Sequence, residues 1–189
     1  MQNFKNAMLK SKILCCFFTV GAVGIFAQTD LQPQWLEVPV NEEFTVEGNL
    51  SVGAPMEDLS WAWNSSVACF PATQARKFTG NHVLYALDLP DHSEMEIQVI
   101  PADKKANFSL YAYEVGQVAA NNTVPRLSSC IRCEADHKWD YKVRGKTQDH
   151  TRTVHDILAI NNPYQVVIGV VGAEGLKEGA YTLVLKIRR

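Results

Sequence analysis

The sequence predicts an all-β protein: a single antiparallel β-sandwich with one long irregular loop, preceded by an N-terminal signal helix. From Gln34 onward the dominant apolar period is two, which is the period of a half-buried strand. The periodic segments are short and separated by turn residues, as in sandwiches of antiparallel strands. Residues 116–153 interrupt this order with small, polar and charged side chains, and they predict the irregular loop.

The N-terminal segment has the three parts of an export signal. Residues 1–12 contain three lysines and no acidic residue, residues 13–26 are apolar, and Ala27 is a small residue before a polar stretch. This apolar run is shorter than the ~18 to 20 residues that a membrane-spanning helix needs. We predict a cleavable signal peptide over residues 1–27, one domain over residues 28–189, a secreted or periplasmic location, and no stable membrane span after cleavage. An uncleaved N-terminal anchor is the alternative.

The charge balance argues against nucleic-acid binding. Of 18 basic residues, three lie in the signal segment, so the exported part keeps 15 basic residues against 20 acidic ones. A net negative charge repels phosphate backbones. A nucleic-acid site would need a basic stripe with interleaved aromatic residues, whereas the basic residues here are scattered. We interpret the densest group, between Arg126 and Lys146, as a solvated loop.

Two strands are expected in the first half of the domain. Residues 43–52 alternate apolar and polar side chains, which predicts a strand with one wet face. In the next segment Leu59, Trp61 and Trp63 occupy every second position and would share one face of a strand.

The second half of the chain has the clearest alternation. Residues 83–89 and 94–99 alternate on either side of Pro90-Asp91-His92, and we predict that they form a hairpin around this turn. Residues 108–113 alternate in the following strand. Residues 164–171 are apolar at every position except Gln165 and Gly169, so this strand is expected to be central in its sheet.

These segments resemble, in their order, the bacterial pre-peptidase C-terminal domain family. Residues 85–90 and 94–99 are similar to that family's opening hairpin, and residues 107–113 to its strand that ends in a Leu-Tyr pair. Residues 164–170 and 179–185 are similar to its last two strands, with Gly-x-Tyr-Thr-Leu the most recognisable string. The resemblance implies a small jelly-roll-like sandwich over about residues 83–188, with an irregular insertion over about residues 116–153.

The family is appended to secreted hydrolases, so the resemblance also implies an accessory role. Two features depart from the family pattern. Phe108 and Ser109 stand where an Asp usually precedes the Leu-Tyr pair, so no polar or metal role is carried over to them. No enzyme domain precedes the sandwich in this sequence, so we expect any hydrolase that it assists to be a separate chain.

Cysteine is the most informative chemistry in the exported part. Cys69, Cys130 and Cys133 remain after the signal segment, an odd number in an oxidising compartment. We predict a disulfide from Cys69 to either Cys130 or Cys133, which would tie the irregular loop to the segment after the tryptophans. The alternative is a redox-active Cys130–Cys133 pair.

A metal site is a weaker hypothesis. Cys130, Cys133 and His137, with His150 or His155 as the fourth ligand, have the ligand types for zinc, but their spacing matches no standard finger. Aspartates 136, 140, 149 and 156 lack the regular spacing of a calcium loop. The sequence contains neither a nucleophile elbow nor a metalloprotease helix, and we predict no catalytic residue and no cofactor.

The tryptophans have two interpretations. Trp61 and Trp63 pack in the core, or they form, with Trp35 or Trp139, an aromatic platform that binds sugar rings or proline-rich chains.

Our leading functional hypothesis is an exported, non-catalytic sandwich that binds a carbohydrate or protein partner, or assists a secreted hydrolase. The ligand-binding candidates are Trp61, Trp63 and Trp139. The alternatives are a metal- or thiol-dependent enzyme centred on Cys130, Cys133 and His137, and a structural envelope component.

Overall fold

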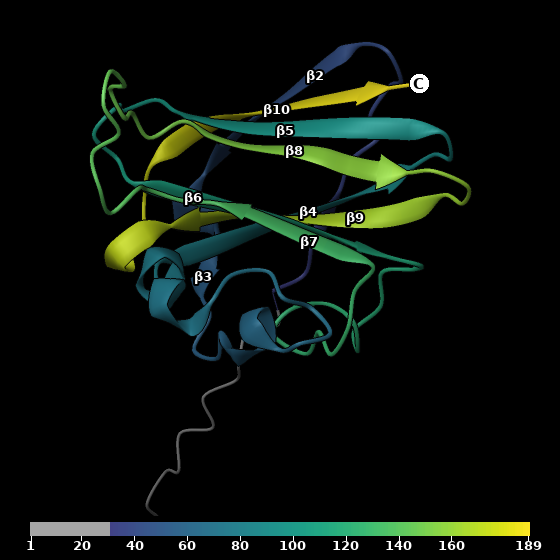
Figure 1. The fold of residues 1–189 in the computed structure, drawn as a ribbon, viewed down its shortest axis with the longest axis horizontal. Helices are drawn as coiled ribbons and strands as arrows, with labels where there is room; N and C mark the ends of the chain where they lie inside the picture. The colour runs from purple at the N-terminus through teal and green to yellow at the C-terminus, as the bar shows by residue number, and fades with distance from the viewer. Residues whose placement is uncertain (1–30) are drawn as a thin grey trace, which may run out of the picture.

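Alternating apolar residues build two β-sheets that face each other. A computed structural model, which describes residues 31–189, contains sheet A, with the strand order β1-β4-β9-β6-β7 and β3 beside β4, and sheet B, with the order β2-β10-β5-β8. Figure 1 shows sheet B above sheet A. All pairings of the long strands are antiparallel, so the predicted antiparallel β-sandwich is confirmed. The predicted signal peptide lies outside the described residues.

The elements of residues 31–189 are mostly strands, joined by short 3₁₀ helices. The strands of sheet A are β1 (Gln34–Trp35), β3 (Ala54–Pro55), β4 (Asn81–Leu89), β6 (Phe108–Val115), β7 (Arg132–Asp136) and β9 (Tyr164–Gly172). The strands of sheet B are β2 (Glu43–Asn49), β5 (Ser93–Pro101), β8 (Arg152–Ala159) and β10 (Ala180–Arg188). The 3₁₀ helices are η1 (Leu50–Val52), η2 (Ser60–Trp63), η3 (Ala72–Phe78) and η4 (Ala173–Gly175). No helix within residues 31–189 is long and apolar enough to cross a bilayer.

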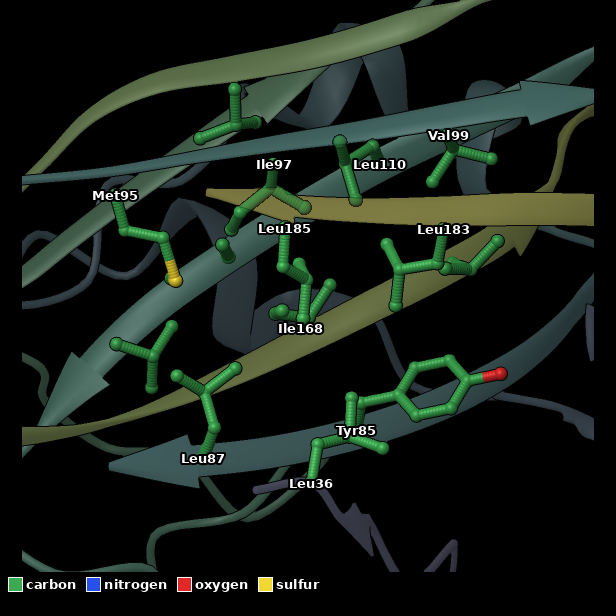
Figure 2. Packing of buried hydrophobic residues seen from close by; sticks show 14 of the residues in the cluster. Leu36, Tyr85, Leu87, Met95, Ile97, Val99, Leu110, Ile168, Leu183 and Leu185 are labelled. Atoms are coloured by element: carbon green, nitrogen blue, oxygen red, sulfur yellow. The ribbon is translucent and has the colours of Figure 1, made fainter. Parts of the chain in front are cut away.

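The main core lies between the two sheets, where the period-two pattern places it. In β5, Met95, Ile97 and Val99 are fully buried, while the residues between them are partly exposed on the outer face. Figure 2 shows these three side chains in one cluster with Leu110 and Ile168, which come from β6 and β9 of the opposite sheet. Alternation along the chain therefore identifies the inner face of β5 correctly.

The predicted hairpin of residues 83–99 is wrong. β4 pairs with β9 in sheet A, whereas β5 pairs with β10 and β8 in sheet B, so Pro90-Asp91-His92 carries the chain from one sheet to the other. Both strands alternate, but β4 is buried on both faces at nearly every position. β4 is covered by an apolar layer on each face, whereas the outer face of β5 is exposed to solvent. The two strands therefore suit different sheets.

β9 is central in sheet A, as its apolar composition predicts, with β4 on one side and β6 on the other. Its Gly169 lies directly opposite Tyr111 of β6, and the tyrosine ring occupies the space where a Cβ atom would be. Gly48 of β2 and Tyr181 of β10 repeat this arrangement in sheet B. In each sheet, therefore, a glycine makes room for a tyrosine ring on the neighbouring strand.

A second apolar layer covers the outer face of sheet A. It consists of η2, η3 and residues 116–131, and we call it the helical layer; Figure 1 shows the 3₁₀ helices below the sheet. Tyr111 and Tyr113 of β6 point into this layer, where they meet Trp61, Phe70 and other buried apolar side chains. This second core explains why β4, β6 and β9 are buried on both faces.

The segment of Leu59, Trp61 and Trp63 is not a strand, and this prediction is wrong. Residues Ser60–Trp63 form η2, in which Trp61 is buried and Trp63 is exposed. A 3₁₀ helix has three residues per turn, so side chains two positions apart point in different directions. In this segment, therefore, apolar residues at every second position do not share one face.

The irregular insertion contains more regular structure than its composition indicates. β7 lies within it and pairs with β6, and β8 begins at its end. The apolar positions of β8 do not alternate, because its pairing with β5 shifts register near Asp156, whose φ of 60° marks a bulge. The bulge removes the period-two signal by which this strand could be recognised.

Candidate functional site

A disulfide joins the helical layer to the edge of sheet A. Cys69 follows η2, Cys133 lies in β7, and their sulfur atoms are bonded. This confirms the prediction that Cys69 pairs with one of the two later cysteines. It contradicts the Cys130–Cys133 redox pair, because Cys133 is already bonded elsewhere.

Cys130 is the free thiol within residues 31–189. Its Sγ lies 3.7 Å from the carbonyl oxygen of Val67, and the side chain is half-buried. Burial, followed by the nearby charge of Glu114, raises the pKa of this thiol to about 11. At neutral pH such a thiol is almost entirely protonated, whereas the nucleophilic species is the thiolate, so the surroundings of Cys130 do not favour a thiol-dependent enzyme.

The residues proposed for zinc do not come together as ligands. Cys133 has no thiolate to offer, His137 packs edge-on against the Phe78 ring at 5.9 Å, and His150 Nδ1 lies 3.1 Å from the Arg152 guanidinium. Burial and then the charge of Arg152 lower the pKa of His150. Within residues 31–189 no three His, Cys, Asp or Glu side chains converge on a common point. The zinc site proposed from the sequence therefore lacks its second sulfur ligand, because Cys133 is bonded to Cys69.

The aspartates considered for calcium are likewise separate. The Asp136 carboxylate accepts a hydrogen bond from the Thr153 N–H at 2.9 Å, and Asp149 accepts one from the Thr151 N–H at 3.0 Å. Asp140 instead forms ion pairs with basic residues of η3. Each carboxylate thus holds a different part of the backbone or a different side chain.

Trp61 belongs to the core and not to a binding surface. Its ring packs at an angle against Phe70 and Tyr111, with centroids 5.7 and 5.1 Å apart, and its indole N–H points to the Met56 sulfur at 3.2 Å. An aromatic platform made of Trp61 and Trp63 is therefore wrong. Trp63 and Trp139 remain on the surface, 41% and 37% exposed.

The exposed apolar side chains of the irregular insertion are concentrated in the loop between β7 and β8, residues 137–151. Trp139 and Val143 are partly exposed, and Tyr141 between them is 87% exposed. Four basic residues, Lys138, Lys142, Arg144 and Lys146, alternate with them. In Figure 1 this loop is the green segment at the left, where the chain passes from sheet A to sheet B.

Asp140 anchors this loop to the helical layer. Its Oδ1 lies 2.8 Å from the Lys77 ammonium and 2.7 Å from the Arg76 guanidinium, and Gln74 donates a hydrogen bond to Oδ2. These hydrogen bonds, the one from Lys77 first, lower the pKa of Asp140 to about 2. Lys77 itself is only 2% exposed, so Asp140 neutralises a charge that is otherwise buried.

A second set of contacts holds the base of the loop; we call these contacts of Gln148 and the ion pairs of Asp140 the two clasps. The Gln148 side chain accepts a hydrogen bond from the Trp139 N–H and donates one to the Trp139 carbonyl oxygen. The first clasp holds Asp140, which lies between the two aromatic residues, and the second holds the backbone of Trp139 itself. The loop therefore presents Trp139 and Tyr141 on a backbone that is held at two points. Such rings, with adjacent Arg, are the residue types that dominate protein interfaces.

Of these residues, only Trp139 is among the sequence-predicted ligand-binding candidates. Tyr141 is visible in the sequence as an aromatic residue within a basic run. The role of Lys77 has no sequence signal, because it depends on a contact with Asp140, which lies far along the chain.

Comparisons with known proteins give structural likenesses without a family. No family model matches the chain, and no curated protein matches it. Among solved structures, it is similar to the pre-peptidase C-terminal domain of collagenase from Bacillus anthracis, with a TM-score of 0.37 and 9% identity, covering 82% of this chain and 96% of that one.

Two further likenesses have similar scores. Aeromonas hydrophila PliG, a periplasmic inhibitor of g-type lysozyme, gives a TM-score of 0.37 and 10% identity, covering 82% of this chain and 95% of that one. The VP2 subviral particle of infectious bursal disease virus gives a TM-score of 0.34 and 7% identity, covering 78% of this chain and 33% of that one.

Proposed function

We propose that this protein is an exported, non-catalytic β-sandwich whose mature domain, residues 28–189, binds a protein partner through the β7–β8 loop. The observation that carries the proposal is the presentation of Trp139 and Tyr141 on either side of Asp140, whose carboxylate is held by Lys77 and Arg76. Export is supported by the Cys69–Cys133 disulfide, because such bonds persist in oxidising compartments.

The anchored loop lowers the cost of binding. Aromatic side chains supply a large contact area with few rotatable bonds, and a backbone already held in place loses little further entropy in a complex. The two clasps, at Asp140 and Gln148, supply this restraint. A partner can therefore gain the burial of Tyr141 and Trp139 without ordering the loop first.

The charge of the loop indicates an acidic partner surface. Lys138, Lys142, Arg144 and Lys146 add positive charge around the aromatic rings, and the single acidic residue among residues 138–146 is already engaged by Lys77 and Arg76. Complementary charges accelerate association and weaken with salt. We therefore expect binding to slow at high ionic strength.

The proposal is tested with immobilised mature protein and the proteins released from the envelope and medium of the producing cells. Bound proteins are quantified by mass spectrometry for the wild type, for Trp139→Ala/Tyr141→Ala, and for Trp63→Ala. We expect at least one bound protein to fall more than tenfold in the double variant and to stay unchanged in Trp63→Ala, which removes an exposed ring elsewhere. The recovered partner, once purified, should bind more slowly to Lys142→Glu/Arg144→Glu.

A separate experiment tests the alternative hypothesis that the loop binds a carbohydrate. A glycan array probed with the same three proteins should give no signal that depends on Trp139 and Tyr141. Binding of a glycan that the double variant abolishes would replace the protein partner with a carbohydrate. If the wild type and the double variant capture the same proteins equally well, the β7–β8 loop is not the binding site.

A further inference from the structure

A surface depression of about 400 Å³ lies on the edge of sheet A, away from the β7–β8 loop. It is lined by Trp35, Leu36, Glu37, Val38, Pro39 and Asp88. Trp35 is 46% exposed there. The volume falls in the range of small ligand sites, about 300 to 1,000 Å³.

Strand pairing explains why an aromatic ring and two carboxylates meet at this place. Trp35 of β1 pairs with Ala86 of β4, and paired residues direct their side chains to the same face of a sheet. Because side chains alternate along a strand, Asp88 shares the face of Ala86. Glu37 lies two residues after Trp35, beyond the end of β1, and lines the same depression. Leu36 has the opposite direction, and Figure 2 shows it beside Tyr85 in the main core.

The Asp88 carboxylate is held in position. Gln165 of β9 donates a hydrogen bond from Nε2 to Asp88 Oδ1 at 2.9 Å, while its own Oε1 accepts one from the Val118 N–H at 2.6 Å. Within residues 31–189, Asp88 Oδ2 has no hydrogen-bond partner and the Glu37 carboxylate has neither an ion pair nor a hydrogen bond. The depression is therefore lined by an exposed indole and by two carboxylates with hydrogen-bonding capacity that the described residues do not use.

The lining carries two formal negative charges and no basic side chain. A cation placed over the indole gains from the ring quadrupole and from both carboxylates. A guanidinium group fits this combination better than an ammonium, because it stacks flat on aromatic rings and donates two parallel hydrogen bonds to a carboxylate.

We propose that this depression binds an arginine side chain of a protein partner, stacked on Trp35 and paired with Glu37 and Asp88. The site is opposite in charge to the β7–β8 loop and shares no residue with it. The test of this arginine site is therefore independent of the test of the proposed function.

The test uses ¹H–¹⁵N NMR of the mature protein at low ionic strength, with the peptide acetyl-Gly-Arg-Gly-amide as the probe. We expect saturable shifts of the Trp35 indole N–H and of the backbone amides around Glu37 and Asp88. The isosteric peptide with citrulline in place of arginine, which is uncharged, should bind at least tenfold more weakly. Added salt should weaken the arginine peptide and leave the citrulline peptide unchanged.

Variants separate the contributions of the lining. Glu37→Gln/Asp88→Asn keeps the size of both side chains and should weaken the arginine peptide about tenfold. Trp63→Ala, which removes an exposed ring outside the depression, should leave it unchanged. Equal binding of the two peptides, or shifts that survive Glu37→Gln/Asp88→Asn, would overturn the proposal. Shifts at Trp35 with methyl glucoside but not with the arginine peptide would identify a sugar site instead.

Discussion

The ammonium of Lys77 lies 2.8 Å from Oδ1 of Asp140, and this ion pair connects a lysine buried in η3 to the loop that carries the exposed aromatic rings. Only the lysine of this pair is buried, since the Asp140 side chain is 31% exposed. Removing the carboxylate leaves the buried lysine without its partner. The contact therefore serves both the stability of the helical layer and the position of the loop.

Asp140→Asn should lower the melting temperature by several degrees and increase hydrogen exchange in residues 137–151. The physical reason is that the buried Lys77 loses the carboxylate that pairs with its ammonium. Adding Lys77→Met should restore much of the melting temperature, since a methionine of similar length is apolar. Scanning calorimetry and exchange mass spectrometry measure the two effects. A double variant no more stable than Asp140→Asn would contradict this explanation.

Loss of the Cys69–Cys133 disulfide should cost about 4 kcal/mol of unfolding free energy, because the bond closes a long loop and restricts the unfolded chain. The two cysteines are 64 positions apart. Urea denaturation of Cys69→Ser/Cys133→Ser against the wild type gives the difference. Cys130→Ser, which leaves the bond intact, is the control and should change the midpoint little. Equal losses in both variants would show that Cys130 takes part in the bond.

Stability should fall as the pH falls from about 6.5 toward 4, and His82 is responsible for part of this fall. Its Nε2 lies 2.9 Å from the Phe78 carbonyl oxygen, which can only accept, so Nε2 carries the proton and Nδ1 accepts from the Tyr111 hydroxyl at 3.3 Å. Burial lowers the pKa of His82 to about 4 from the ordinary 6.5.

The sign follows from proton binding. Between these two pKa values the unfolded chain binds a proton at His82 that the folded protein does not, so acid favours unfolding. His82→Gln removes this titration and should flatten the pH dependence of the urea midpoint between pH 6.5 and 4. If the profile keeps its wild-type slope in His82→Gln, other groups account for the acid sensitivity.

Gly169→Ala should destabilise the protein by roughly 1 to 3 kcal/mol, the usual cost of forcing extra atoms into a packed core. The new Cβ would overlap the ring of Tyr111, which is fully buried between β9 and the helical layer. Gly116→Ala is the matched control, because nothing lies within 4 Å of the position where its Cβ would be. Denaturation of the two variants should differ clearly, and equal stabilities would disprove the role of Gly169.

The candidate site could be predicted only in part. The sequence identifies residues 116–153 as the place to look, and Trp139 as an exposed candidate. It cannot show that Asp140 meets Lys77, because that contact depends on how η3 packs on sheet A. It also misplaces Trp61, because an apolar residue at every second position has the same appearance in a short 3₁₀ helix as in a strand.

The sequence by itself determined which face of β5 meets the main core, that β9 is central, and that Cys69 pairs with a later cysteine. Only the tertiary structure decided that β4 and β5 belong to different sheets. Alternation records which face of a strand meets apolar neighbours, but it contains nothing about which strand takes the backbone hydrogen bonds. That choice depends on packing between segments far apart in the chain, here the second apolar layer that buries β4 on both faces.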